Sequence, residues 1–157
     1  MIFIHLSKAD KDDLPEILAL QKLAFYENSV RYNDVNIQPL TQTLSDITEE
    51  AKTHIFLKAT VDGKIVGSVR GILRDDHAYI GKLIVHPDYQ NRGIGRKLML
   101  AVESEFDTTK FELGTGHLDT KNIAFYTKLG YEIYAKEKVS ESLFFIRMRK
   151  VRNGNCA

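Results

Sequence analysis

The chain has 157 residues, 43% hydrophobic and 27% charged, which fits one globular domain large enough to bury a core. Its 22 basic and 21 acidic residues are interspersed and leave a formal net charge of +1, so no broad cationic face is available for a nucleic-acid backbone. The single cysteine, Cys156, excludes a disulfide within the chain, and no stretch has the pattern of a signal peptide or a membrane span. We therefore expect a cytoplasmic protein with neither a nucleic-acid nor a membrane partner.

The first half of the chain predicts a strand, two helices and a three-stranded meander. Residues 2–7 alternate as a strand does, and apolar residues then recur at helical spacing from Leu14 to Phe25. The polar run over 27–39 breaks that spacing and predicts a loop. The remaining expected elements are a helix at about 41–52 and strands at 54–61, 64–73 and 77–85, the first two joined by an Asp62–Gly63 hairpin turn.

The second half predicts a helix on the sheet, a strand, a short helix and a closing hairpin. Leu83-Ile84-Val85 is wholly apolar, which indicates a central strand that is buried on both faces. Together with the first half, this order of elements predicts one mixed α/β domain over 1–150 and a loose tail over 151–157. The expected elements are a helix from Ile94 to about Glu105, a strand at 110–113, a helix at 122–129 and strands at 131–138 and 143–150.

A turn rich in glycine connects the central strand to the following helix. It reads Gln90-Asn91-Arg92-Gly93-Ile94-Gly95, and the free amides of a helix's first turn attract an anion. A P-loop would need Lys and then Ser or Thr after Gly95, and a dinucleotide fingerprint would need a third glycine near Leu98. Neither motif fits. Alone, two glycines this close are common in turns, but their place between strand and helix predicts a phosphate site.

A second motif, Asn122 to Tyr131, follows about thirty residues downstream. Asn122 and Tyr126 are four residues apart, so they share one face of a helix, while Phe125 and Leu129 share another. Taken alone, Asn122 as a helix N-cap and Tyr126 as a partly buried aromatic residue explain the pattern. Beside a phosphate-binding turn, a phenol that can donate a proton to a leaving thiolate becomes the better interpretation.

The two motifs together resemble the GCN5-related N-acetyltransferase (GNAT) family. The family signature, Gln or Arg, two residues, Gly, one residue, and Gly or Ala, corresponds here to Gln90, Gly93 and Gly95. The order of elements resembles the family over 2–150, and the specific residues lie in 83–96 and 122–131. The resemblance implies a mostly antiparallel, twisted sheet with a splayed parallel strand pair between its fourth and fifth strands, flanked by helices. It also implies direct transfer of an acetyl group from acetyl-CoA to a primary amine without a metal.

The resemblance further implies which residues hold acetyl-CoA. In the family, the amides of the turn bind the CoA pyrophosphate, and the backbone of the central strand pairs with the pantetheine arm. A tyrosine at the position of Tyr126 is the usual general acid, and an asparagine at that of Asn122 often holds the cofactor. The implied cofactor-binding residues are Leu83, Ile84, Val85, Gln90, Asn91, Arg92, Gly93, Ile94, Gly95, Arg96, Asn122 and Tyr126.

The general base and the acceptor stay open at this point. Many relatives place a glutamate on the central strand, but this chain has the stretch 79–82, Tyr-Ile-Gly-Lys, there. Glu112 and His117 are the nearest candidates for the base, and Asp119 is a weaker third, although each also fits an ordinary surface role. The resemblance implies that the segment between the first two helices lines the acceptor entrance, with Tyr26, Tyr32 and Asp34 as candidate contacts to a small-molecule or peptide amine.

Two questions about assembly and activity also stay open. A noncatalytic acyl-CoA-binding regulatory module is the main alternative to an enzyme. A plain interaction domain would need both motifs to arise by coincidence. Self-association through the closing hairpin or the outer helices, giving a homodimer, agrees with the sequence but does not follow from it.

Overall fold

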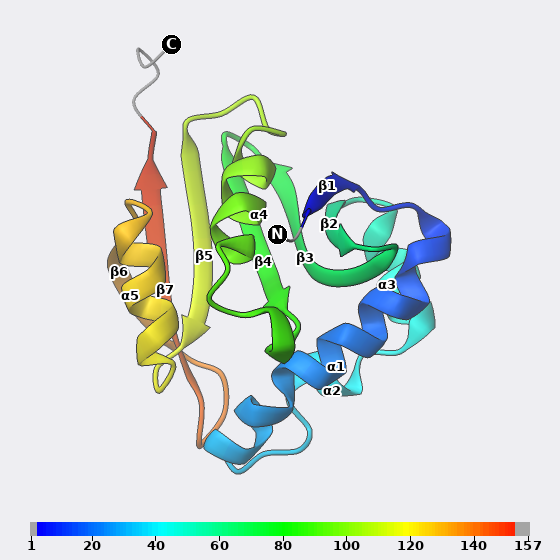
Figure 1. The fold of residues 1–157 in the computed structure, drawn as a ribbon. Coiled ribbons are helices and arrows are strands. Elements are labelled where there is room, and N and C mark those ends of the chain that lie inside the picture. The colour runs from blue at the N-terminus through cyan, green and yellow to red at the C-terminus, as the bar shows by residue number, and fades with distance from the viewer. Residues whose placement is uncertain (1–2, 153–157) are drawn as a thin grey trace.

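The computed structural model describes residues 3–152, which form one seven-stranded sheet with helices on both faces (Figure 1). The strand order is β1-β2-β3-β4-β5-β7-β6, and all neighbours are antiparallel except β4 and β5. This confirms the expected mixed α/β fold. The strands are β1 (His5–Lys8), β2 (Ile55–Val61), β3 (Lys64–Arg74), β4 (His77–Val85), β5 (Lys110–Gly116), β6 (Glu132–Lys138) and β7 (Phe144–Val151); the helices are α1 (Leu14–Arg31), α2 (Gln38–Thr41), α3 (Leu44–Ala51), α4 (Ile94–Glu103) and α5 (Thr120–Lys128).

Two apolar cores lie on opposite faces of the sheet. Alternation along β2 shows this, because Phe56 packs with α1 and α3 while Leu57 and Ala59 pack with α4. We call these sides the α1 face and the α4 face. Figure 1 shows α4 and α5 against the same face, and residues of both helices belong to one core. The sheet therefore separates α1, α2 and α3 from α4 and α5.

A β-bulge in β4 exchanges the faces of its residues. Ser68 pairs with Ile84 and Arg70 with Gly81, so Lys82 and Leu83 together oppose the single residue between them on β3. Lys82 adopts the left-handed conformation, with φ 48°. Before the bulge Ile80 packs in the core of the α4 face, and after it Ile84 packs in that of the α1 face. The bulge thus directs the last residues of β4 differently from the first.

The parallel pair is short and then opens. β4 and β5 pair only where His77–Tyr79 meets Lys110–Glu112, so the edge of β4 toward β5 has no strand partner further along. Figure 1 shows the two strands diverging toward the end of α1. The expected opening between the fourth and fifth strands is confirmed. It also explains why only Ile84 of the apolar run is buried, whereas Leu83 and Val85 are half-buried.

Several boundaries differ from the sequence-based expectation: β1 is His5–Lys8 instead of 2–7, α3 begins at Leu44 instead of about 41, α5 begins at Thr120 instead of 122, and three further differences follow. α1 continues to Arg31, so the loop predicted over 27–39 is wrong over 27–31, and α2 occupies part of the rest. The polar side chains in the last turns of α1 form hydrogen bonds within the helix or with residues at the cavity. Ser29 Oγ, for example, donates to the Tyr26 carbonyl at 2.6 Å. β5 runs to Gly116 instead of ending near 113. Val151 belongs to β7, and the rest of the predicted tail, with Cys156, lies outside the described residues from 153 onward.

Within residues 3–152, no helix combines the length and apolar composition needed to cross a membrane. The same residues contain no group of three or more His, Cys, Asp or Glu side chains arranged to hold a metal ion.

Candidate active site

A cavity of about 630 Å³ lies at the open end of the β4–β5 splay. Its wall is built from the end of β4, the turn before α4, the start of α5 and the C-terminal half of α1. Segments far apart in the sequence therefore meet at one place. The wall includes these predicted cofactor-binding residues: Leu83, Ile84, Val85, Gln90, Asn91, Gly93, Ile94, Gly95, Arg96 and Asn122.

The turn before α4 has the backbone of an anion site. Asn91 and Gly93 are both left-handed, with φ of 63° and 81°, which curls successive amides toward one side. The first helical hydrogen bond runs from the Lys97 amide to the Gly93 carbonyl at 3.1 Å, so the amides just before it are free of helical acceptors. No atom lies within 4 Å of a Cβ built on Gly93. The turn thus offers amides, the positive end of α4 and open space.

The arginines of the turn behave differently. Arg96 is exposed and lines the cavity. Arg92 does not line it, because its guanidinium lies 5.4 Å from the centre of the Tyr89 ring and donates to the Asp88 carbonyl at 3.4 Å. The predicted role of Arg92 toward the cofactor therefore has no direct geometric support in this conformation.

Asp119, at the start of α5, connects that helix to α1. Its carboxylate accepts from Asn28 Nδ2 at 3.1 Å and from Tyr32 Oη at 3.1 Å, and it forms an ion pair with Arg31. Tyr32 Oη also accepts from the Leu118 amide at 2.9 Å. These contacts close one end of the cavity. Glu27, Asn28 and Arg31 belong to the segment that the sequence predicts at the acceptor entrance, but they line the cavity from one face of α1 instead of from a loop.

Tyr126 lies beside the cavity but not in its wall. Phe125 lines the cavity, whereas Tyr126 is buried, 9% exposed, with its ring centre 5.2 Å from that of Phe125 and 6.0 Å from that of Tyr131. Burial, and then the charge of Asp119, raises the pKa of the Tyr126 phenol. A proton is therefore kept on this oxygen at neutral pH. The predicted pairing of Tyr126 with Asn122 toward the cofactor is not seen, since only Asn122 reaches the wall.

Glu112 lies on the α1 face at the last paired position of the splay, opposite Tyr79 of β4. Its carboxylate accepts a hydrogen bond from Tyr134 Oη, and His77 Nε2 lies 3.7 Å away. A hydrogen bond to the same carboxylate raises the pKa of the Tyr79 phenol. The strand next to the central strand thus carries a carboxylate that faces Tyr79 where the two strands diverge.

His117 is less free to accept a proton. Its Nδ1 accepts from the Phe144 amide at 3.1 Å, which leaves Nε2 as the protonated nitrogen when the ring is neutral. The ring packs against Tyr32 and Phe144, with centres 5.5 and 5.4 Å apart. Neither Glu112 nor His117 lines the cavity.

The predicted acceptor contacts are spread apart. Tyr26 is 63% exposed, and Asp34 accepts from the Asn36 amide at 2.9 Å, which is a local turn contact. Tyr32 is buried, and burial raises the pKa of its phenol to about 12. None of the three lines the cavity, and their role toward an acceptor stays a prediction.

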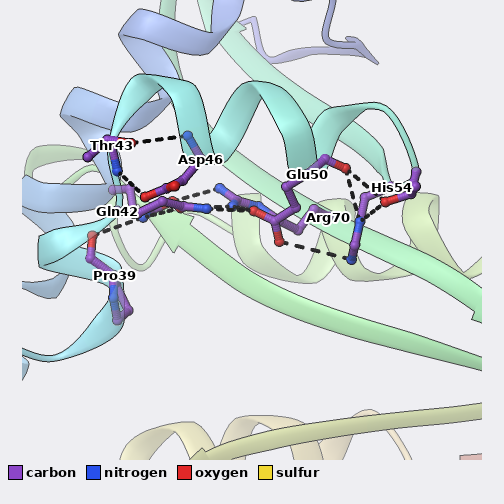
Figure 2. A network of polar contacts seen from close by, with 9 residues as sticks. Pro39, Gln42, Thr43, Asp46, Glu50, His54 and Arg70 are labelled. Carbon is purple, nitrogen blue, oxygen red and sulfur yellow. Dashed lines mark hydrogen bonds and ion pairs between the residues drawn. The ribbon is translucent and has the colours of Figure 1, made fainter.

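A buried polar network on the α1 face lies next to β4 (Figure 2). Arg70 of β3, 2% exposed, pairs with Glu50 Oε1 at 2.6 Å and donates to Gln21 Oε1 at 2.7 Å. Gln42 Nε2 donates to Glu50 Oε1 at 2.9 Å, and Gln42 Oε1 accepts from Gln21 Nε2 at 2.9 Å. Figure 2 shows how this network joins the α2–α3 region to the sheet. This network was not predicted from the sequence, because the spacing of its residues carries no motif.

Comparisons with known proteins agree with this geometry. The sequence model described as the acetyltransferase (GNAT) family matches residues 14–131. Protein YqkA of Bacillus subtilis is 28% identical over 129 residues, which cover 82% of this chain and 37% of that protein. An acetyltransferase of Pectobacterium atrosepticum is 36% identical over 81 residues, which cover 50% of this chain and 57% of that protein. The chain thus spans only part of the curated relatives it matches.

Solved structures share the fold at low identity. The ribosomal-protein-S18-alanine N-acetyltransferase of Escherichia coli superposes with a TM-score of 0.77 at 18% identity, covering 99% of both chains. A PaiA N-acetyltransferase of Thermoplasma acidophilum in complex with coenzyme A superposes with a TM-score of 0.69 at 19% identity, covering 95% of this chain and 99% of the other. YncA of Salmonella typhimurium, a putative acetyltransferase with its cofactor acetyl-CoA, gives 0.73 at 19% identity, covering 98% and 96%.

Proposed function

Because the chain belongs to the acetyltransferase (GNAT) family, we propose that it transfers an acetyl group from acetyl-CoA directly to a primary amine of a small molecule or peptide. One observation carries this proposal. The free amides at the start of α4 and the unpaired edge of β4 open into the same cavity. A pyrophosphate needs the first feature and an extended pantetheine amide chain needs the second.

The wall residues fit such a donor. The amides of Ile94 to Arg96 and the Arg96 guanidinium would bind phosphate oxygens, while the backbone of Leu83–Val85 would hydrogen-bond the amides of the arm. When bound, acetyl-CoA supplies the activated acetyl group. Coenzyme A and acetyl-CoA in the Thermoplasma and Salmonella structures support this assignment.

Two side chains are proposed for proton handling. The Tyr126 phenol is kept protonated by burial and follows the wall residue Phe125 in sequence, and we propose it as the acid. Glu112 is the better candidate for the base than His117, because it sits where the strands diverge and carries a negative charge, whereas His117 Nδ1 is occupied by a backbone amide. Asn122, in the cavity wall, is proposed to hold the donor.

The test is a panel of primary amines incubated with the protein and acetyl-CoA, with release of free CoA thiol as the readout. We expect at least one amine to raise thiol release above the rate without acceptor, and mass spectrometry to find the acetylated amine. Binding of CoA by calorimetry without turnover on any amine would instead assign the chain to the noncatalytic acyl-CoA-binding class. Absence of CoA binding would contradict the proposal altogether.

A further inference from the structure

The α1 face of the sheet is open beside the β4–β5 splay. Gly114, two residues beyond the last β4–β5 pair, is exposed on this side of the sheet, and Figure 1 shows α4 and α5 covering the opposite face. An acceptor can reach the splay from this open side without crossing the cavity wall that would hold the donor. The side chains that line this approach therefore determine which amines fit.

Two glycines form the floor of the approach. Gly81 and Gly114 each lie two residues beyond the last pair, Tyr79 with Glu112, and so point to the same face as that pair. A Cβ built on Gly81 meets no atom within 4 Å. A Cβ built on Gly114 would lie 2.8 Å from Nη1 of Arg147. The absence of a side chain at Gly114 thus makes room for the Arg147 guanidinium at the mouth of the splay.

Arg147 is a half-buried cation without an ion pair. Over residues 3–152, no carboxylate oxygen lies within 4.0 Å of its guanidinium, in contrast to Arg31 with Asp119 and Arg70 with Glu50. The hydrogen bond to Glu112, and then burial, raise the pKa of the Tyr134 phenol, while the nearby Arg147 acts in the opposite direction. A guanidinium has five N–H donors in a planar fork that matches a carboxylate, and most of these donors are still available here.

The charge at the opening is positive overall. Lys82 at the bulge is a second half-buried cation, and its Nζ has no carboxylate within 4.0 Å in the described part of the chain. Lys82 interacts with the Arg70–Glu50 pair, while Glu112 has Arg149 directly opposite it on β7 and Arg147 two residues from Arg149 along that strand. Positive side chains thus outnumber carboxylates around the splay, which favours an acceptor that carries a negative group.

We propose that the acceptor amine also carries a carboxylate, which Arg147 binds through its guanidinium while Glu112 faces the amine. This inference rests on the proposed function and narrows its substrate class to amino acids and related amino carboxylates. The proposed site is formed by Arg147 over Gly114, with Glu112 two residues away along β5.

The experiment compares acceptors that differ in one charge. Each α- or β-amino acid is paired with its carboxamide, and kcat/KM is measured for both at a saturating concentration of acetyl-CoA. We expect the carboxylate of at least one pair to exceed its carboxamide by about tenfold or more, because a carboxylate gains charge-assisted hydrogen bonds. Arg147→Gln should lower kcat/KM for the carboxylate by about tenfold to a hundredfold and leave that for the carboxamide nearly unchanged. Arg147→Lys, which keeps the charge but not the fork, should fall between.

Arg149→Gln is the matched control. Arg149 lies on the same strand and carries the same charge, but it is exposed, lies opposite Glu112 and stacks 4.9 Å from the Tyr134 ring centre. Its replacement can change both kcat/KM values through Glu112, but it should leave the ratio of carboxylate to carboxamide unchanged within about twofold. Thermal melting of each variant separates loss of folding from loss of recognition.

Several outcomes would overturn the inference while the proposed function stands. These are equal kcat/KM for carboxylate and carboxamide in every pair, equal losses for both in Arg147→Gln, or a preference for aminoalkyl phosphates over amino carboxylates. If no amine is acetylated although CoA binds, the proposed function fails, and this inference fails with it.

Discussion

At the scale of single residues, replacing two glycines that have the same backbone conformation distinguishes a loss of cofactor binding from the effect of backbone strain. Gly93 and Gly63 have φ of 81° and 80°, and a Cβ on either meets no atom within 4 Å. Replacement by Ala should cost each roughly 1 kcal/mol of folding free energy. Only at Gly93 does the new methyl enter the cavity wall. We expect Gly93→Ala to weaken CoA binding about tenfold or more, and Gly63→Ala to leave it unchanged. Calorimetry on both variants checks this, and equal affinities would remove the phosphate role of the turn.

Tyr126 is the second residue whose role can be isolated. Tyr126→Phe keeps the ring that packs on Phe125 and Tyr131 but removes the proton donor. If the phenol protonates the leaving sulfur, single-turnover transfer should slow by about a hundredfold to ten-thousandfold with CoA affinity unchanged. Enzyme in excess over acetyl-CoA isolates this step from product release. Unchanged single-turnover rates would make Tyr126 a packing residue, in line with its absence from the cavity wall.

The base can be assigned by a parallel pair of substitutions. Glu112→Gln retains an oxygen that accepts from Tyr134 Oη but loses the charge, and turnover should drop by about a hundredfold or more if Glu112 takes the proton. His117→Ala should then affect the rate much less. Rate profiles against pH for both variants are the measurement. If only His117→Ala loses the fall in rate at acidic pH, His117 is the base instead of Glu112. If both variants keep that fall in rate, water is the proton acceptor.

At the scale of elements, the connection between α1 and the loop before α5 depends on one position without a side chain. A Cβ on Gly116 would lie 2.1 Å from Tyr32 Oη and 2.6 Å from Asp119 Oδ2, so Gly116→Ala must displace buried polar contacts. We expect it to lower the free energy of unfolding by about 1–3 kcal/mol, a fall in Tm of roughly 2–4 °C per kcal/mol. Gly81→Ala, where the methyl meets no atom within 4 Å, is the control. Equal melting temperatures would show that the loop adjusts freely.

The same elements show what the sequence could and could not predict. Strand and helix order followed from local periodicity, and the turn at Gly93 was found because phosphate binding depends on consecutive backbone groups. The end of α1 was not predicted because its last turns contain Asn28 and Arg31, whose polar side chains resemble those of a loop. Both side chains bond Asp119, which lies 91 and 88 residues away in the sequence, so no local pattern indicates the contact. The hydrogen bond between Tyr134 and Glu112 joins residues 22 positions apart, so the local sequence pattern does not predict it either.

At the scale of the whole molecule, the network in Figure 2 joins the helices of the α1 face to the sheet. Arg70 is 2% exposed, so removing the charge of its partner leaves a buried cation without compensation. Glu50→Gln should lower the free energy of unfolding by about 1–3 kcal/mol, less than for a fully buried pair because Glu50 is 20% exposed. Chemical denaturation at pH 7 measures this.

The same carboxylate makes stability depend on pH. Burial alone would raise the pKa of Glu50, but Arg70 and the Gln42 hydrogen bond outweigh it and hold the pKa below the ordinary 4.5. A carboxyl group whose pKa is lower in the folded state stabilises the fold above its unfolded pKa, and this contribution is lost as the pH falls through the folded value. Stability should therefore decline below about pH 4.5. Glu50→Gln, which cannot titrate there, should decline less steeply than the native chain, while other carboxyl groups with lowered pKa, such as Asp13, keep part of the slope. Denaturation midpoints of the native chain and of Glu50→Gln, measured between pH 7 and pH 3, test this. If the two midpoints fall by the same amount over this range, the Arg70–Glu50 pair contributes no net charge stabilisation.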